Sequence, residues 1–369
     1  MKIITFVLLL VITLTVYVGW HLWRLTPMGW PVKLAVTGVF VLWMLAFIVS
    51  FFTLERYPIV VSTVLYEVGT MWLIVFLYLL IIFLLADVAW LCHLWPKPLK
   101  DSASGLLIVM GIITGVIVLG GRHYHRKYRE EITITTDKHI EQPLTVVLAS
   151  DLHIGYHNRK GELARWVDLI NAEQPDVVLF GGDIIDRSLR PIIEGNYAEE
   201  LRRIQAPVYT VFGNHEYFSS SKQMVGGQAS LSDIRRFLED AGIVLLRDSV
   251  AHYKGLDIIG RDDRMAHHRA DVKDLAVGLR GFTILLDHQP YRLEEAEQAG
   301  IDFQFSGHTH HGQVWPVSYI TDAMYEKSWG HHQRGSTQYY ISSGLGIWGP
   351  KVRVGTRSEY VVLHVLPKP

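Results

Sequence analysis

The sequence predicts an α/β domain preceded by an α-helical region that crosses a membrane several times. Three observations lead to this prediction. Long apolar runs dominate the first third of the 369-residue chain, and charged residues make up only 19% of the whole, against ~25% in an average soluble domain. From Glu131 onward, short strand-like runs alternate with segments of helical spacing. Side chains that can bind metals follow directly after five of these strands.

Four apolar runs make up the expected membrane region. Each approaches the ~20 residues that a helix needs to cross a bilayer, which disfavours the alternative of buried helices in a soluble domain. The runs are Ile3 to Trp20, Val32 to Thr53, Gly69 to Leu94 and Gly105 to Gly121. The first run resembles a signal peptide, but it lacks an Ala-x-Ala-like cleavage site and further runs follow, so we interpret it as an uncleaved anchor. We expect about four transmembrane helices in residues 1–125 and one domain in residues 126–369.

The distribution of aromatic and basic residues predicts how the chain lies in the cell membrane. Tryptophans cluster near the ends of the runs, as in interfacial belts: Trp20, Trp23, Trp30, Trp90 and Trp95. Four crossings put the amino terminus and the large domain on one side, with Lys2, Arg56, Arg122, Arg126, Lys127 and Arg129. The other side has Arg24, Lys33, Lys97 and Lys100. Since basic residues favour the cytoplasmic side, we expect a multi-pass protein with a cytoplasmic catalytic domain.

Two features of the membrane region have alternative interpretations. Asp87 lies inside the third run. An acid there could be functional, for example on a transport pathway, or it could be hydrated or hydrogen-bonded to a neighbouring helix near a helix end. A single isolated acid favours the second interpretation. The basic cluster from Arg122 to Arg129 could bind anionic lipid headgroups, or it could act only as a stop-transfer anchor.

The remainder of the chain is expected to begin with β-α-β-α-β order and to form an α/β sheet. Expected strands are 131–136 (an edge strand), 144–149, 176–180, 208–212, 243–246, 250–253, 256–259, 282–286, 302–305, 338–342 and 359–365. Expected helices are 161–171, 197–204, 231–238, 272–279 and 293–299. Residues 218–230 are rich in Ser and Gly and are expected to form a mobile loop. His331 and His332 are expected in another loop.

Composition narrows the possible functions. The net charge is −1 and the pI is about 7.0, so no global basic field supports binding to a nucleic-acid polymer. The single cysteine, Cys92, excludes a disulfide within the chain. The chain has 18 histidines, most of them after residue 120. Many histidines together with acidic residues are typical of metal sites, although this signal is weak on its own.

The stretch from Asp176 to Asp186 is the centre of the expected site. A short apolar, β-branched strand ends at Gly181 and Gly182, which allow a tight turn and keep bulky side chains away. Asp183 then stands at the carboxyl end of the strand, where ligands bind in open α/β sheets. A carboxylate held there can bridge two metal ions.

Four more clusters follow predicted strands in the same way. Asp151 and His153 are spaced by two, so both project to one side if the chain is extended there. The other clusters are Gly213-Asn214-His215-Glu216, Asp287-His288 and Gly307-His308-Thr309-His310. Each cluster alone is a weak signal, because a single histidine or a Gly-Asp pair usually has a structural role. Five clusters at strand ends can meet at one sheet edge, and this combination predicts a metal site.

In these motifs the chain resembles the calcineurin-like metallophosphoesterase family. The matching residues are Asp151-x-His153, Gly182-Asp183-x-x-Asp186, Gly213-Asn214-His215-Glu216, His288 and Gly307-His308-Thr309-His310, within residues 140 to 365. Gly312-Gln313 and the stretch from Gly344 to Pro350 are similar to the membrane-attached bacterial branch. The resemblance implies a two-sheet sandwich flanked by helices, with metals at the strand-end loops.

The resemblance also implies a role for each motif residue. One metal ion would be held by Asp151, His153, Asp183 and His310, and the second by Asp183, Asn214, His288 and His308. His215 would act at the leaving group, as an acid or as a charge stabiliser. Asp186 would support the site by orienting a ligand or capping the next helix. The mixed oxygen and imidazole ligands suit two divalent ions of Mn, Fe, Zn or Co better than Ca.

The expected function is hydrolysis of a phosphate mono- or diester by a metal-bound hydroxide. Two metal ions ~3.5–4 Å apart can hold the attacking and leaving oxygens and supply hydroxide near neutral pH. Because the site is tethered to a bilayer, a lipid- or nucleotide-linked pyrophosphate is a reasonable substrate. The alternative is a non-catalytic metal-binding membrane scaffold, which the complete ligand set and His215 disfavour.

Two features near the last motif stay open. His311 could contact the substrate phosphate, or it could merely be solvated. The segment from Val314 to Trp329 is rich in apolar and aromatic residues. It could be a lid that dips into the membrane interface to admit a lipid, or it could pack against the sheet.

Overall fold

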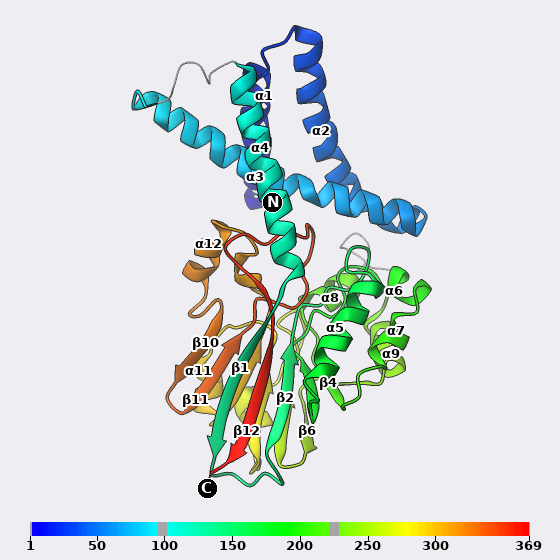
Figure 1. The fold of residues 1–369 in the computed structure, drawn as a ribbon. Coiled ribbons are helices and arrows are strands. Elements are labelled where there is room, and N and C mark those ends of the chain that lie inside the picture. Colours follow the sequence, from blue (N-terminus) through cyan, green and yellow to red (C-terminus); the bar gives the residue numbers. More distant parts are fainter. Residues whose placement is uncertain (1, 95–101, 221–228, 369) are drawn as a thin grey trace. The chain divides into compact units, whose positions relative to one another are not determined.

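A computed structural model describes residues 2–94, 102–220 and 229–368 (Figure 1). The side chains of residues 2–4, 7 and 8 are not described. By its internal contacts the chain divides into two compact units. The first is residues 1–122 with 349–352, and the second is residues 123–348 with 353–369. Trp95, Lys97, Lys100 and residues 221–228 of the expected mobile loop lie outside the described residues.

The first unit consists of apolar helices. They are α1 (Lys2–Leu25), α2 (Trp30–Thr53), α3 (Ile59–Leu91) and α4 (Ala103–His125), with a short 3-10 turn, η1 (Leu54–Arg56), after α2. Within the described chain, three helical segments are long and apolar enough to cross a membrane: Trp30–Arg56, Ile59–Leu91 and Ala103–His125. In α1 the segment whose side chains are all described, Leu9–Leu25, is also apolar but shorter than these three. Large apolar side chains such as Trp30 and Val60 are exposed on these helices, as expected for surfaces that face lipid.

Contacts inside this unit hold the helices together. At Gly69 of α3 a Cβ would lie 3.0 Å from Oγ of Ser50 and 3.1 Å from the carbonyl oxygen of Ala46 on α2, so glycine permits the close approach that membrane helices favour. Asp87 accepts a hydrogen bond from the Tyr17 hydroxyl at 2.6 Å, and its Oδ2 lies 3.1 Å from Nε2 of His21. Asp87 is therefore bonded to a neighbouring helix, in agreement with the second interpretation of this residue.

The second unit contains two six-stranded sheets. The first has the order β1 (Lys127–Thr136), β12 (Ser358–Pro367), β2 (Leu144–Ala149), β3 (Val177–Phe180), β4 (Val208–Thr210) and β5 (Ile243–Leu245). The second has the order β10 (Gly330–Arg334), β11 (Thr337–Ile341), β9 (Phe303–Ser306), β8 (Phe282–Leu286), β7 (Leu256–Gly260) and β6 (Ser249–Tyr253). Strands β2 to β5 are parallel, and so are β7, β8, β9 and β11. The expected two-sheet α/β fold is confirmed.

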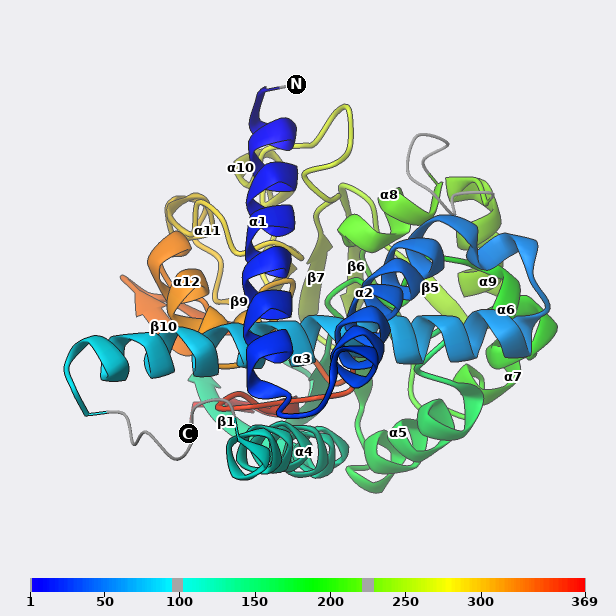
Figure 2. The same ribbon diagram turned by 90° about the horizontal axis from the view of Figure 1, so that it is seen from above.

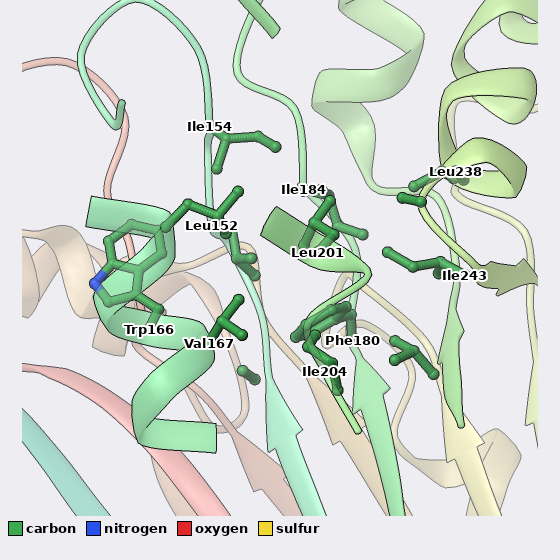
Figure 3. Close-up of a cluster of buried hydrophobic side chains, with 14 of the residues drawn as sticks. Leu152, Ile154, Trp166, Val167, Phe180, Ile184, Leu201, Ile204, Leu238 and Ile243 are labelled. Atoms are coloured by element: carbon green, nitrogen blue, oxygen red, sulfur yellow. The ribbon is translucent and has the colours of Figure 1, made fainter. Parts of the chain in front are cut away.

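Helices cover the outer faces of both sheets (Figure 2). Beside the first sheet lie α5 (Lys160–Ala172), α6 (Arg190–Glu194), α7 (Tyr197–Leu201) and α9 (Leu231–Asp240), and beside the second lie α10 (Val272–Leu275) and α11 (Glu294–Gln298). Helix α12 (Val317–Met324) lies beyond the strand ends, above β10 in Figure 1. Between the sheets, Leu148, Ile284 and Phe305 belong to one fully buried apolar cluster. A second cluster joins α5 and α9 to the first sheet through residues such as Trp166 and Leu238 (Figure 3). Apolar burial on both faces explains why the parallel strands are nearly continuous apolar runs.

The structure corrects some of the expected elements. His331 and His332 lie in strand β10, where His331 pairs with Tyr340 of β11, and not in a loop. The strand was missed because Gly330–Arg334 contains no apolar residue and is held only by pairing with its neighbour. Helices α6, α8 (Asn214–Ser220) and α12 were also not expected, since each has only five to eight residues and shows too little helical periodicity to be recognised.

Candidate metal centre

Loops that follow parallel strands of both sheets bring the expected ligands together. Asp151 and His153 follow β2, and Asp183 follows β3. Asn214 begins α8 after β4, His288 follows β8, and His308 and His310 follow β9. All of these side chains except His308 are buried, and His308 is partly buried. Because strands β2 to β4 and β7 to β9 are parallel within their sheets, their carboxyl ends lie at one edge, and the site forms there.

One group of ligand atoms gathers around His153. Its Nε2 lies 3.1 Å from Nε2 of His310, 3.7 Å from Oδ1 of Asp151 and 3.8 Å from Oδ2 of Asp183. Nε2 of His310 lies 3.4 Å from Oδ1 of Asp151. Two buried imidazole nitrogens therefore face each other among carboxylate oxygens. A cation between them would satisfy all four groups.

A second group shares Asp183 with the first. Nε2 of His288 lies 3.1 Å from Oδ2 of Asp183 and 3.2 Å from Oδ1 of Asn214. Nδ1 of His308 lies 2.6 Å from the same Asn214 oxygen. The Oδ2 atom of Asp183 thus faces both groups. Oxygen and imidazole donors in this mixture are typical ligands of divalent transition metals.

Backbone groups fix the orientation of these side chains. Oδ1 of Asp183 accepts the backbone N–H of His215 at 2.8 Å. Nδ1 of His288 donates to the carbonyl of Gly181 at 2.7 Å, so Nε2 is the ring atom directed at the ligand group. The carboxylate of Asp151 accepts the backbone N–H of His308 at 3.1 and 3.2 Å. Such outer bonds select the tautomer and aim the ligand.

The backbone at the ligands is strained. Five non-glycine residues of the two groups have positive φ: Asp151 (55°), His153 (45°), Asp183 (52°), His308 (72°) and His310 (49°). Each such conformation costs ~1–3 kcal/mol and is concentrated at functional sites. Glycine leaves the space that the site needs, because a Cβ at Gly213 would collide with Oδ1 of Asp183.

Comparison with known proteins identifies the family. Residues 144–312 match the family model described as calcineurin-like phosphoesterase. These residues form a calcineurin-like phosphoesterase domain. Both ligand groups lie within the matched residues.

Relatives of the phosphoesterase domain include membrane proteins. An uncharacterized metallophosphoesterase of Helicobacter pylori is 30% identical over 249 residues, covering 65% of this chain and 64% of that protein. A Danio rerio protein named transmembrane protein with metallophosphoesterase domain is 30% identical over 236 residues, covering 58% of this chain and 52% of that protein. The chain thus spans less than two thirds of these relatives. The NAD nucleotidase structure of Haemophilus influenzae is 15% identical, with a TM-score of 0.38 over 57% of this chain and 46% of that one.

The charges in the phosphoesterase site are arranged for a cation. Burial opposes ionisation of Asp183, but His288 and His215 hold its pKa well below the usual range. Burial also opposes protonation of His153, yet Asp151 and Asp186 raise its pKa to about 10. Without metal, the site therefore holds protons beside its carboxylates. Divalent ions can replace these protons, since metal ligands bind in their deprotonated form.

The other two histidines of the ligand groups, His308 and His310, are neutral at physiological pH. Burial and the neighbouring His288 lower the pKa of His308 to about 4. Burial likewise holds the pKa of His310 well below its ordinary value. Neutral imidazole is the form that binds a metal, so each ligand group already contains one histidine in the required state.

Asp186 and His215 lie beside the two ligand groups. Nδ1 of His215 donates to the carbonyl oxygen of Asp186 at 2.6 Å, so its Nε2 is the atom available for chemistry. Oδ1 of Asp186 lies 3.3 Å from Nδ1 of His215 and 3.5 Å from Nδ1 of His153. The carboxylate is therefore behind both imidazole rings. The supporting role of Asp186 stays a prediction.

His311 is packed within the phosphoesterase domain. Its ring stacks on Trp329, with centroids 5.0 Å apart and planes 15° apart. Its Nε2 lies 3.6 Å from Oδ1 of Asp322. The side chain is partly buried and not simply solvated. Contact between His311 and a substrate stays a prediction.

Three further buried residues organise the site and were not identified from the sequence. Glu216 accepts the backbone N–H groups of Gly213 (2.7 Å), Ile185 (3.0 Å) and Asp183 (3.2 Å). Glu216 belongs to the Gly-Asn-His-Glu motif, so the sequence marked this residue, but no role was assigned to it. Its carboxylate ties the loop after β3 to the loop after β4.

Asn158 and Arg353 are the other two buried residues that organise the site. Asn158 donates to the carbonyl oxygens of Leu152 and Ile347, both at 2.9 Å, and accepts from the hydroxyl of Tyr124 at 2.7 Å. Arg353 donates to the carbonyls of His310 (2.8 Å), Ser343 (2.5 Å) and Gly346 (3.2 Å). Burial lowers the pKa of Arg353 to about 10. Neither residue lies in a recognisable motif, so sequence alone offers no signal for either role.

Proposed function

We propose that the chain is a membrane-anchored phosphoesterase that hydrolyses a phosphate mono- or diester with two divalent metal ions. The observation that carries the proposal is that one oxygen, Oδ2 of Asp183, faces both His153 and His288. A shared carboxylate between two groups of ligands is the arrangement that a dinuclear centre needs. When bound, the two ions would generate a nucleophile from water and neutralise charge that develops on the phosphoryl group.

Each proposed ion has its own ligands. Asp151, His153, Asp183 and His310 would hold the first ion, and Asp183, Asn214, His288 and His308 would hold the second. Manganese, iron, zinc and cobalt suit these donors. Asn214 contributes a neutral oxygen, which limits the negative charge of the second group.

His215 is the proposed proton donor to the leaving oxygen. Its ring is held by the Asp186 carbonyl through Nδ1, so Nε2 is free to give a proton or to stabilise charge. The same ring lies edge-on to His153, with centroids 4.4 Å apart, so it is beside the first ligand group. The carboxylate of Asp186 orients both rings.

A substrate at the bilayer surface is proposed because helices that could cross a membrane precede the phosphoesterase domain in the chain. The last residues of α4, His123 to His125, belong to the phosphoesterase unit. Tyr124 bonds to Asn158, which in turn holds the carbonyl of Leu152, between the ligands Asp151 and His153. The first residues of the phosphoesterase unit are therefore tied to a ligand loop. We propose that the substrate is a lipid-linked or nucleotide-linked phosphate ester.

Helix α12 is the proposed lid for such a substrate. Trp315, Tyr319, Ile320 and Met324 are 41–66% exposed and follow the histidine motif directly in the chain. Exposed apolar residues grouped on one short segment are typical of surfaces that contact membranes. We place α1 to α4 as four spans and the phosphoesterase domain in the cytoplasm. A carboxyl-terminal reporter that is active only outside the cytoplasm should then stay inactive.

The proposed function is tested with purified full-length protein in detergent. The protein is supplied with Mn, Zn or Mg, and hydrolysis of a phosphomonoester and a phosphodiester is measured beside a chelator control. Activity should require metal and should be lost in Asp183→Ala and His215→Ala. Full activity in Asp183→Ala would contradict the proposal. Metal binding without any hydrolysis by the unmodified protein would instead support a non-catalytic scaffold.

A further inference from the structure

The loop after β7, residues 261–270, lies beside the second ligand group and has no role in the assignments above. Nη1 of Arg261 lies 3.3 Å from Oδ2 of Asp287, and Arg269 pairs with the same carboxylate. Asp287 immediately precedes the ligand His288. The loop is therefore attached to the strand end that carries a metal ligand, and its position is fixed relative to the site.

A second attachment uses the residue on the other side of His288. Nε2 of Gln289 donates to both carboxylate oxygens of Asp263, at 3.0 and 2.8 Å. Asp263 also accepts the backbone N–H of Met265 at 2.8 Å. The loop is thus held on both flanks of His288. The exposed side chains of this loop are therefore held in a fixed position relative to His288.

Arg264 is the charged residue that this loop exposes without a partner of opposite charge. The adjacent carboxylates are occupied, since Asp262 accepts two bonds from Arg247, at 2.7 and 3.0 Å, and Asp263 is bound by Gln289. Among the described residues, no ion pair joins Arg264 to a carboxylate. Its guanidinium lies 4.1 Å from the ring centroid of Tyr291.

The contacts of Tyr291 lead from Arg264 to the second ligand group. The Tyr291 hydroxyl donates to the hydroxyl of Tyr325 at 3.0 Å. The Tyr325 ring lies edge-on to His308, with centroids 6.3 Å apart and planes at 72°. Arg264 therefore stands at the end of a row of aromatic rings that begins at a proposed metal ligand. We refer to Tyr291 and Tyr325 as the tyrosine ledge.

We propose that Arg264 and the tyrosine ledge form a subsite for a second anionic group of the substrate, adjacent to the phosphoryl group that is cleaved. A guanidinium stacked on an aromatic ring keeps its edge N–H groups free for bidentate bonds to phosphate. Two metal ions held by the ligand groups would engage only one phosphoryl group. A pyrophosphate linkage supplies the neighbouring phosphate that the subsite would hold. This inference rests on the proposed function and narrows its substrate class to diphosphate esters.

The test compares Arg264→Gln with Arg280→Gln in the full-length, Mn-loaded protein. Arg280 is also exposed, but it precedes β8 and is at the opposite end of that strand from His288. The substrates are bis(p-nitrophenyl) phosphate, with one phosphorus, and ADP-ribose, with a pyrophosphate. Arg264→Gln should raise KM for ADP-ribose about tenfold, as expected for a lost charge-assisted bond, and leave KM for the one-phosphorus ester unchanged. Arg264→Lys should give a smaller increase, and Arg280→Gln none.

A binding measurement makes the test independent of turnover. Inorganic pyrophosphate and phosphate are titrated into each Mn-loaded protein, and binding is measured by calorimetry. Pyrophosphate can also remove Mn from the protein, but this background is common to all variants and cancels when they are compared. The preference for pyrophosphate over phosphate should fall about tenfold in Arg264→Gln only. An unchanged preference, or an equal loss for both substrates, would overturn the subsite. If the unmodified protein hydrolyses neither ester, the proposed function fails, and the calorimetry still decides on the subsite.

Discussion

The Oδ2 atom of Asp183 lies 3.1 Å from Nε2 of His288. The other oxygen of this carboxylate accepts the backbone N–H of His215, so the side chain cannot turn without losing that hydrogen bond. One oxygen is therefore held where two groups of ligands meet. The strained backbone of Asp183, with φ of 52°, is consistent with a position that is maintained for function and not for stability.

Replacing Asp183 by Asn should remove the carboxylate that bridges the two proposed ions but keep the shape of the side chain. The neutral amide retains a hydrogen-bonding oxygen and loses the negative charge that two cations share, so we expect fewer than two ions per chain and a kcat about 10²–10³-fold lower. Elemental analysis and phosphodiester hydrolysis by the full-length protein measure both effects. Asp168→Asn, at an exposed ion pair with Arg203, is the control and should change neither quantity.

His215→Gln should slow the reaction and leave metal binding intact. The lost proton donor is expected to lower kcat about 10²–10⁴-fold for an alkyl phosphate ester. The loss should be much smaller for a p-nitrophenyl ester, because p-nitrophenolate leaves without a proton. Steady-state kinetics with both esters, together with metal content, provide the measurement. Equal losses for the two esters, or loss of metal, would contradict this role.

Metal affinity should increase with pH. In the metal-free protein Asp151 and Asp186 raise the pKa of His153 to about 10 against the effect of burial, and Asp183 raises that of His288 well above its ordinary value. Both rings are protonated at neutral pH and must lose their protons to bind an ion. Raising the pH lowers the concentration of the protons that compete with the metal, so metal affinity rises with pH. Calorimetry of Mn binding in two buffers of different ionisation enthalpy should detect proton release; a pH-independent affinity would contradict the charge arrangement.

Asn158→Ala should destabilise the phosphoesterase domain. The change removes the side-chain donor of the buried Leu152 carbonyl. It also removes one of the two side chains bonded to the Ile347 carbonyl, since His157 contacts the same oxygen. The expected loss in free energy of unfolding is ~1–3 kcal/mol. Thermal unfolding of the full-length protein in detergent reports the change as a lower Tm. Gln333→Ala, at an exposed position of β10, is the control. An equal Tm for the two variants would show that Asn158 does not tie these loops together.

Removing the apolar surface of α12 should affect lipid substrates selectively. Ile320→Ser with Met324→Ser replaces two exposed apolar side chains, so turnover of a lipid-linked phosphate ester should fall while turnover of a soluble ester stays the same. Val277→Ser is a matched control, because Val277 is 75% exposed and lies before β8, at the opposite end of that strand from His288. Equal losses with both substrates would mean that α12 supports the fold and is not a lid.

The residues that gather at the candidate site could be predicted because each lies within a few positions of a strand end. A parallel sheet places such positions at one edge whatever the rest of the chain does. Asp151, Asp183 and His288 are of this kind. The residues that support them depend on distant pairing: Asn158 bonds to Ile347, 189 positions away. No local pattern marks such a residue, so it could not be predicted.

The same contrast applies to the fold. Buried strands such as β2 and β8 were predicted from their apolar runs. Strand β10 was not, because its polar residues are held by pairing with β11. The subsite at Arg264 depends on Tyr325, which is 61 positions further along the chain, and becomes visible only when the loops after β7 and β9 are brought together.

The most direct test of the shared carboxylate is electron paramagnetic resonance of the Mn-loaded, full-length protein. Two Mn ions bridged by Asp183 at ~3.5–4 Å should give the spectrum of a spin-coupled pair, with two equivalents of Mn per chain. In Asp183→Asn the coupled signal should disappear. A single equivalent of Mn, or two uncoupled ions in the unmodified protein, would contradict the dinuclear site.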